Sequence, residues 1–329
     1  MTDTGRSRAP HATSGATRLR GLVREATLAA SSHNTQPWKF RLGERSMAIF
    51  PDLTRRCPVV DPDDHHLFVS LGCATENLVC GALANGLYPQ VEHRADRIDV
   101  AFEEALPIRS TLYDALPHRQ CSRSIYDGQG LPRGELDRLE RAARRPGVHA
   151  IFLTARSEIE TILEYVTRGN TAQIGDPAFV RELGAWVRFN EADAAQTCDG
   201  LSSLSTGNPS IPRWIGQRLL RLVLTPKSEN DKCAAQLRSS AGVVVFLSDG
   251  NDPRHWIEVG RSYERFALQA TALGIGNAFL NQPVEVAPLR AQFAAWLNAG
   301  SRRPDLVVRF GRGPEMPRSR RRPLEEVLA

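Results

Sequence analysis

The apolar positions along the chain follow two different spacings, and each spacing predicts a kind of element. Residues 18–30 place Leu, Val and Ala on one stripe at the period of an amphipathic helix. Residues 37–50 alternate apolar with polar side chains on both sides of a Gly43-Glu44 turn, which predicts a β-hairpin. Between these segments stands SSHNTQPW, residues 31–38, where six consecutive polar residues interrupt both patterns.

A long apolar helix is expected after the hairpin. Asp61 or Asp63 can accept hydrogen bonds from its first backbone N–H groups, and Gly86 can end it just after Asn85. A pair of strands is expected over about 89–103. The second part of the chain predicts a helix, a strand, further helices, a strand, a long helix ended by Gly274, and two strands. These elements are expected over 133–144, 148–154, 156–190, 243–248, 254–273, 276–281 and 305–310.

The two long helices share small and acidic residues at identical spacing. The four residues Gly72, Glu76, Ala82 and Gly86 recur as Gly260, Glu264, Ala270 and Gly274. Four matches alone could arise by chance, but the matched strands before and after them favour a duplicated unit. Small residues allow close approach, so we expect each copy to be a central helix packed against its twin. The two units would then pack within one chain as the subunits of a homodimer do.

This duplication predicts a disordered tail at 1–16, a first unit at 17–106 and a second at 107–329. Residues 191–232 interrupt the second unit and are too long for an ordinary connection, so they predict either a lid or a disordered insert. Within this insert, RWIGQRLLRLVL is amphipathic. We expect it to dock on the body of the protein in preference to a membrane surface.

The composition is that of an ordinary globular protein, with 41% hydrophobic and 24% charged residues. No apolar run reaches the roughly 20 residues of a membrane-spanning helix, and residues 1–16 lack the apolar centre of a secretory signal.

The six cysteines form no CxxC pair, which indicates a reduced, cytoplasmic location. Cys73 and Cys80 are expected to face the core. Adjacent His65 and His66 should point to different faces of a helix, so no metal site is predicted.

Much of the net charge of +5 comes from the last thirty residues, which hold many arginines and few acids. These are Arg302, Arg303, Arg309, Arg312, Arg318, Arg320, Arg321 and Arg322. They are compatible with a solvated tail, with non-specific nucleic-acid contact or with an anion site for one phosphate. Composition does not choose among the three.

Motifs of several enzyme classes are missing from the sequence. It contains no Walker P-loop, no GxSxG and no HExxH, and Gly274-Ile275-Gly276 ends a helix where a dinucleotide fingerprint would begin one. What remains is a set of neutral hydrogen-bonding groups and arginines. Four of these groups belong to Ser31, Ser32, Asn34 and Gln36. They could form hydrogen bonds with the edge of a planar heterocycle, or they could simply cap the backbone at the end of a helix. Taken alone, the capping interpretation is favoured.

In combination, these segments resemble the FMN-dependent nitroreductase superfamily, and within it the twin-fold Acg-type nitroreductases. Residues 30–38 match the family's P/A-S-S-x-N-x-Q-P-W segment, and 119–123 followed by Tyr126 is a looser match to its R-R-x-x-R segment. Residues 264–274, 281–285 and 320–328 resemble its central helix, a strand-end segment and the C-terminal signature. The likeness spans residues 18–328 and is weakest over 130–240. It implies an α+β fold of two fused nitroreductase-like units, each a mainly antiparallel sheet flanked by helices, packed as a pseudo-dimer.

The resemblance also implies roles in FMN binding. Arg119, with one or more of Arg318, Arg320 and Arg321, would hold the phosphate. Arg123 would stabilise the negative charge of the reduced flavin at N1/O2, and a backbone N–H of Asn281 or Gln282 would meet N5. The side chains expected to line the ring and ribityl edge are Ser31, Ser32, Asn34 and Gln36. Cys121 stands where the family usually has Ser or Thr, and a thiol is a weaker donor.

The implied function is hydride transfer from NAD(P)H through FMN to a nitroaromatic, quinone or similar small-molecule acceptor, without a catalytic side chain. The alternative is a protein that holds FMN under a closed lid with little turnover, and a weaker third hypothesis is nucleic-acid binding by the arginine tail.

A second, symmetry-related FMN site would need an arginine-rich motif before Ser31 and an SSxN segment in the second unit. Because both are missing from the sequence, one FMN per chain is expected. No membrane partner is expected, and the internal pseudo-dimer would allow a monomeric protein.

Overall fold

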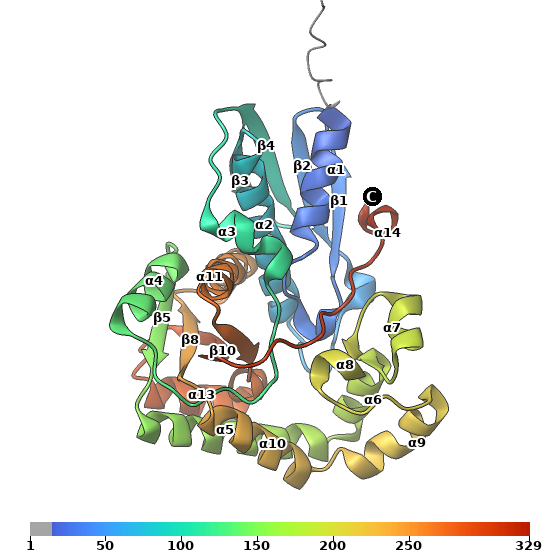
Figure 1. The fold of residues 1–329 in the computed structure, drawn as a ribbon, viewed down its shortest axis with the longest axis vertical. Coiled ribbons are helices and arrows are strands. Elements are labelled where there is room, and N and C mark those ends of the chain that lie inside the picture. The colour runs from blue at the N-terminus through green and yellow to red at the C-terminus, as the bar shows by residue number, and fades with distance from the viewer. Residues whose placement is uncertain (1–14) are drawn as a thin grey trace, which may run out of the picture.

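The computed structural model describes residues 15–329, which form two antiparallel sheets flanked by helices (Figure 1). The first sheet contains β1 (Trp38–Leu42), β2 (Ser46–Pro51), β3 (Leu87–His93) and β4 (Ile98–Glu104), in the spatial order β1-β2-β4-β3. Helices α1 (Gly15–Ala26) and α2 (His65–Ala84) pack against it. The predicted hairpin, strand pair and both helices are therefore confirmed. The predicted tail lies outside the described residues except for residues 15 and 16, which begin α1.

The second sheet repeats the topology of the first. Its strands are β5 (Val148–Leu153), β8 (Gly242–Ser248), β9 (Gly276–Phe279) and β10 (Arg303–Gly311), in the order β5-β8-β10-β9. In both sheets the fourth strand in the chain lies between the second and third, and one long helix connects the second strand to the third. That helix is α2 in the first unit and α11 (Pro253–Ala272) in the second. The shared order confirms the predicted α+β fold of two equivalent units.

The second sheet has helices on both faces, which explains why β8 is apolar throughout. Val243, Val245 and Leu247 point into a core shared with α5 (Arg156–Gly175), α10 (Pro226–Arg238) and α13 (Ala287–Trp296). Val244 and Phe246 point to the opposite face, toward α11 and α4 (Arg133–Ala143). A strand that is buried on both faces has no polar alternation.

The helices α2 and α11 cross in the middle of the molecule at the two matched glycines. A Cβ atom at Gly72 would lie 2.1 Å from the carbonyl oxygen of Ile257, and one at Gly260 would lie 2.0 Å from that of Val69. The Cys73 thiol donates to the Gly260 carbonyl at 3.3 Å, so the two backbones are in direct contact. The expectation that each copy packs against its twin through small residues is confirmed.

Helix α2 begins and ends as the sequence indicates. The Asp61 carboxylate accepts hydrogen bonds of 3.0 Å from the backbone N–H groups of His66 and Leu67, and Gly86 follows the helix with a φ of 70°. Cys73 and Cys80 are buried. Helix α2 is long and apolar enough to cross a membrane by length and composition, but 78% of its most apolar 18-residue stretch is buried inside the protein. Its central position accounts for its apolar composition.

The interrupting segment is folded. It begins inside a small lobe formed by α6 (Pro177–Trp186), β6 (Val187–Arg188), α7 (Glu191–Thr197), β7 (Leu201–Ser202), α8 (Ser203–Thr206) and α9 (Arg213–Val223). Strands β6 and β7 pair in parallel, and α9 packs against α6. The disordered interpretation of residues 191–232 is therefore wrong, and the lid stays a prediction. The lobe lies beside the second sheet, at the lower right of Figure 1.

The end of the chain returns to the first unit. After β10 it runs across the molecule to α14 (Leu324–Val327), beside α1 and β1 (Figure 1). The Ala329 backbone N–H donates to the Phe40 carbonyl at 2.9 Å, and Leu328 forms a parallel bridge with Phe40. We call residues 312–329 the C-terminal arm. The short elements not yet named are η1 (Ser32–Asn34), η2 (Leu53–Arg55), α3 (Thr111–Ala115), η3 (Leu116–His118) and α12 (Gln282–Glu285).

Replacement of Gly72 by Ala tests the helix crossing. The new methyl group meets backbone atoms of α11, so the helices must separate, and we expect a loss of about 1–3 kcal/mol of unfolding free energy. The matched control is Gly21→Ala in α1, where a Cβ meets nothing within 4 Å. This control should gain about 0.5–1 kcal/mol from helix propensity. Urea unfolding measures both, and equal stabilities for the two variants would contradict the close crossing.

Candidate functional site

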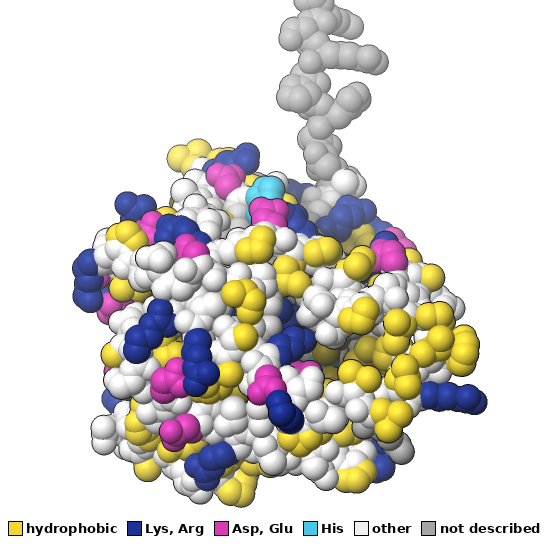
Figure 2. All heavy atoms as spheres, turned by 60° about the horizontal axis from the view of Figure 1, so that its bottom comes forward, with side chains coloured by type: hydrophobic (Ala, Val, Ile, Leu, Met, Phe, Trp, Pro, Cys, Tyr) yellow, Lys and Arg dark blue, Asp and Glu magenta, His cyan; other side chains and the backbone are white. Residues whose placement is uncertain are grey.

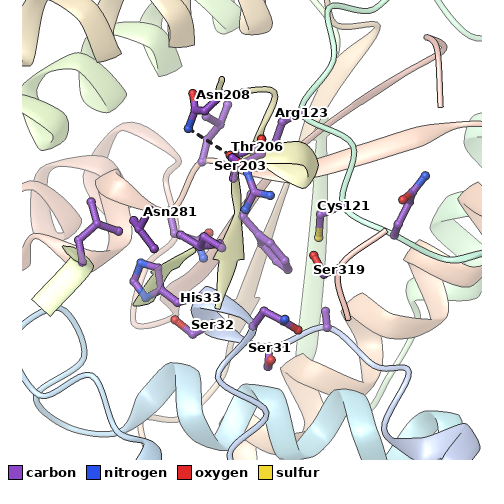
Figure 3. A pocket seen from close by; sticks show the side chains of 18 of the residues that line it. Ser31, Ser32, His33, Cys121, Arg123, Ser203, Thr206, Asn208, Asn281 and Ser319 are labelled. Carbon is purple, nitrogen blue, oxygen red and sulfur yellow. Dashed lines mark hydrogen bonds between the residues drawn. The ribbon is translucent and has the colours of Figure 1, made fainter. Parts of the chain in front are cut away.

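A cavity of about 660 Å³ lies where the two units meet the lobe and the C-terminal arm. Side chains from distant parts of the chain face it, including those of Ser31, Ser32, Cys121, Arg123 and Asn281 (Figure 3). Ten of the twelve predicted site residues line it. They are Ser31, Ser32, Asn34, Arg119, Cys121, Arg123, Asn281, Gln282, Arg318 and Arg321. The structure does not bring Gln36 and Arg320 to the cavity wall.

The stretch 31–38 has an unusual backbone. His33, Asn34 and Gln36 have φ angles of 47°, 54° and 53°, in the left-handed region that residues other than glycine rarely adopt. The turn is closed by the Gln36 backbone N–H, which donates to the Ser31 hydroxyl at 3.1 Å. Such strain persists only when surrounding contacts fix the conformation, and it is common at functional sites.

Those contacts come from the lobe and from the C-terminal arm. The Asn34 carboxamide donates to the carbonyls of Gly200 and Arg320, both at 3.2 Å, and accepts from the Arg321 guanidinium at 3.1 Å. The Gly200 N–H donates back to the Asn34 carbonyl at 3.2 Å. The fully buried Gln36 donates to the Cys198 carbonyl at 2.9 Å and accepts from the Arg322 N–H at 2.8 Å. Gln36 therefore holds three segments together behind the cavity wall.

Arg119 forms a buried ion pair at the base of the cavity. Its Nε lies 3.0 Å from Glu264 Oε1, and its Nη2 donates to the Leu28 carbonyl at 2.8 Å. Burial alone would lower the pKa of Arg119, but the Glu264 carboxylate and three further neighbouring groups together raise it above its usual value, so the guanidinium keeps its charge. Among the described residues its Nη1 finds no hydrogen-bond acceptor although it is buried. A buried charged donor without a partner is costly unless a ligand satisfies it.

Two further polar groups face the cavity unpaired. The Arg123 guanidinium makes no hydrogen bond or ion pair with any residue that the structure describes, and neither does the Ser32 hydroxyl. Burial and the positive charge of Arg123 lower the pKa of His33 to about 4, so this imidazole is neutral. The cavity wall thus combines uncompensated positive charge with neutral donors. That chemistry suits an anionic ligand.

The other predicted arginines are largely used by the protein itself. Arg321 donates to the carbonyls of Thr27, Leu28 and Ala29 at 2.8–3.3 Å, and burial lowers its pKa to about 10. Arg318 bonds the Pro117 carbonyl, and Arg320 is exposed and pairs with Glu191. These contacts fasten the C-terminal arm. Arg309, which belongs to the strand expected over 305–310, is fully buried in β10 and lies over the ring of Tyr126 at 4.0 Å.

Asn281 and Gln282 begin α12 at the opposite wall. The Asn281 carboxamide accepts from the Val307 N–H at 3.0 Å, and Gln282 donates to the side chain of Asn170 at 3.0 Å. The first N–H groups of a helix are not used inside it, so these backbone donors are available to a ligand. Cys121 lies near the Tyr263 hydroxyl, with 3.8 Å between sulfur and oxygen.

Sequence reasoning missed several polar groups of the cavity. Gln120 Oε1 and Ser203 Oγ are buried and lack partners among the described residues. Glu285 also lines the cavity, and burial raises its pKa to about 7, partly offset by a 2.6 Å hydrogen bond from Gln173. Glu285 stood inside the matched segment 281–285, so its position was available from the sequence, but its burial was not.

A group that could hold a metal ion lies next to Glu285. Ligand atoms of Asp61, His65 and His66 are all within 4.8 Å of one another. The expectation that His65 and His66 point apart is wrong, because the two rings meet edge to face at the first turn of α2, 4.5 Å between centroids. The loop before the helix brings Asp61 back over them. His65 already bonds Asp305 at 2.8 Å and Asp61 caps the helix, so these side chains have partners without an ion.

Comparison with known proteins gives distant relatives. No family model matches the chain. Two curated proteins named "Putative NAD(P)H nitroreductase", from two strains of Mycobacterium tuberculosis, are 24% identical over 325 residues, covering 94% of this chain and 90% of each relative. The chain is thus a distant homologue of these nitroreductases over nearly its whole length.

Similar solved structures share less sequence. The FMN-dependent nitroreductase of Mycobacterium smegmatis in complex with NADPH is 12% identical, with a TM-score of 0.43, over 66% of this chain and 96% of that one. Oxidised iodotyrosine deiodinase bound to FMN and 3-iodo-L-tyrosine is 12% identical, with a TM-score of 0.42, over 64% of this chain and 95% of that one.

Replacement of Glu285 by Gln tests the buried carboxyl. Burial raises the pKa of Glu285 to about 7 in the folded protein, whereas its pKa in the unfolded chain is near 4.3. The unfolding free energy that its protonated form contributes is therefore fully present below about pH 4.3 and is lost as the pH rises through 7. The neutral amide avoids that loss. Between about pH 5 and pH 8, the unfolding free energy of the variant relative to wild type should therefore rise by about 1–3 kcal/mol. Urea unfolding of both proteins at the two pH values measures this change. A difference that does not change with pH would contradict this.

Proposed function

We propose that this protein is an FMN-dependent oxidoreductase of the nitroreductase type, which carries reducing equivalents from NAD(P)H to a small acceptor such as a nitroaromatic or a quinone. The homology over 94% of the chain supports the class of reaction. The observation that carries the proposal is a set of cavity-lining groups that have no partner in the part of the chain that the structure describes: Arg119 Nη1, the Arg123 guanidinium and the Ser32 hydroxyl.

These groups fit a flavin mononucleotide. A phosphate dianion needs guanidinium partners, and Arg119 has a buried donor to offer, with Arg318 and Ser319 also on the cavity wall (Figure 3). Arg321 contributes charge, but its donors are already bonded to carbonyls. The ring and ribityl chain need neutral donors and acceptors, which Ser31, Ser32 and Gln120 provide.

When bound, FMN supplies the hydride chemistry between nicotinamide and acceptor. Arg123 would stabilise the negative charge of the reduced flavin, which would raise its reduction potential. The backbone N–H groups that begin α12 would help to hold the flavin from the opposite wall. The lobe contributes apolar side chains to the cavity, so these electrostatic interactions would act in a medium of lower dielectric constant than water. No side chain is required as a base.

We propose one FMN per chain, with both units contributing to the site. Glu264 holds Arg119 on the side of the cavity, whereas its counterpart Glu76 binds Arg261 and Arg265, both at 2.9 Å. On that side the arginines of α11 already satisfy the carboxylate. Because one chain supplies both walls of the site, no partner subunit is needed.

A second function, storage of FMN without turnover, is favoured by the ties between lobe and site. The reciprocal hydrogen bonds between Asn34 and Gly200, together with the ion pair of Arg55 and Asp199, fasten the lobe to the wall of the cavity. A lobe that never opens would exclude nicotinamide. Both functions require a yellow protein, but only the oxidoreductase allows NADPH or NADH to reduce the bound flavin.

Reduction of the purified protein separates these functions. We expect FMN absorbance at about one flavin per chain, and we expect NADPH or NADH to bleach it without oxygen. A yellow protein that neither donor bleaches would be a storage protein. A colourless protein that FMN does not reconstitute would contradict both functions.

Replacement of Arg123 by Gln tests the unpaired guanidinium. Loss of one charge-assisted hydrogen bond to the flavin should weaken FMN binding by roughly 10–100-fold, or lower the potential of the bound flavin by about 30–60 mV. Flavin fluorescence titration and dye-equilibrated reduction measure the two effects. The matched control is Arg320→Gln, an exposed arginine outside the cavity, which should change neither. Equal behaviour of the two variants would remove Arg123 from the site.

A further inference from the structure

The cavity has a second, apolar side that the flavin site does not explain. The lobe contributes Phe179 and Leu183 from α6, Phe189 from the following loop, and Leu220 and Leu224 from α9 and its end. None of these side chains offers a hydrogen bond. We call this part of the cavity the apolar arm.

The packing of α9 defines one wall of the apolar arm. Gly216 lies directly against the ring of Phe189, where an added Cβ would come within 2.2 Å of a ring carbon. Gly184 of α6 would place a Cβ 3.0 Å from Leu220. The Ile211 N–H donates to the Phe189 carbonyl at 3.0 Å, just before α9 begins. The amphipathic segment therefore docks on the body as expected, through a close contact at a glycine.

The other side of α9 remains apolar and exposed. Leu219 and Val223 line the cavity and are also 40% and 65% exposed, so they form its mouth. Trp214 and Leu222, next to them, are 64% and 73% exposed. Figure 2 shows hydrophobic side chains gathered on the side of the molecule where the lobe lies, next to a hollow with basic side chains inside it. An apolar path thus runs from the cavity to solvent, and exposed apolar patches of this kind mark binding sites.

We propose that the acceptor is a quinone with a long apolar side chain. Its ring lies at the polar wall with Ser32 and Arg123, and its chain lies in the apolar arm and leaves between Leu219 and Val223. A nitroaromatic or a quinone without a chain leaves the arm unfilled. A chain fills it, and each buried methylene strengthens binding by about fourfold.

The acceptor reaction rests on the proposed function and is balanced by it. NAD(P)H gives up a hydride, and solvent supplies one proton. The quinone takes up two electrons and two protons and leaves as the hydroquinone, while the nicotinamide leaves oxidised. The apolar arm takes no part in the bond changes. It determines which acceptor binds.

Two benzoquinones with the same ring, one unsubstituted and one with a decyl chain, test the proposal with the flavin-loaded protein. Oxidation of NADPH should show a kcat/KM at least about tenfold higher for the decyl compound, through a lower KM. In the double variant Leu219→Glu with Val223→Glu this advantage should fall to about twofold or less. The chain-free quinone should be reduced as before. Both positions are exposed, so folding should be unaffected.

The matched control is Leu204→Glu, an exposed leucine of the same lobe outside the cavity wall, which should keep the full advantage. A readout independent of turnover is the binding of 4-decylphenol and of phenol, which are redox-inert here, measured by calorimetry. The decyl compound should bind at least about tenfold more tightly, and only the mouth variant should lose this difference.

The outcomes separate the two proposals. If 4-decylphenol binds as described but neither quinone oxidises NADPH, the apolar arm stands and the proposed function is wrong. If both quinones react equally and 4-decylphenol binds no better than phenol, the proposed function stands and the apolar arm has another role. A chain advantage that the mouth variant retains would also overturn the proposal.

Discussion

The direct contact of α2 with α11 at Gly72 and Gly260 is the constraint on which the rest of the structure depends. Two helices can approach this closely only where neither has a side chain. The matched glycines therefore fix the point at which the helices cross and the distance between them there. One turn later each helix has a glutamate, and the crossing carries both glutamates into the boundary between the units. The positions of the buried charges therefore follow from the backbone contact.

The two glutamates show how a symmetric framework gives one site. Glu76 meets Arg261 and Arg265 of the opposite helix, and its negative charge is satisfied within the crossing. Glu264 meets Arg119, which comes from the connecting segment and keeps one buried donor without a partner within residues 15–329. Burying an ion pair is costly, and the cost is offset only when hydrogen bonds complete it. On the Glu76 side the protein completes the network itself, whereas on the Glu264 side the network ends at the cavity.

The sequence predicted the elements with a clear period and failed where the period was weak. The hairpin, α2, β8 and α11 have apolar patterns long enough to identify, whereas α10 is mostly polar and α3 is short, so neither has a stripe that stands out. The matched segments identified most residues of the candidate site, but they did not reveal which way each side chain points. Gln36 turns away from the cavity because three residues of its turn adopt left-handed backbone, and no pattern of residue types reveals φ. Arg321 and Arg320 have the same chemistry, and only the fold shows that one bonds buried carbonyls and the other an exposed glutamate.

The C-terminal arm has a consequence for the order in which the protein is completed. The first sheet is built from residues 38–104, which leave the ribosome early and can pair with one another at once. The carbonyls of residues 27–29 and the amide of Asn34, in contrast, receive their partner Arg321 only after residue 321 has left the ribosome. The wall of the cavity is therefore finished long after the first sheet. A ligand that needs this wall can bind only after that point, so folding of the first unit and binding of the ligand are separate steps in time.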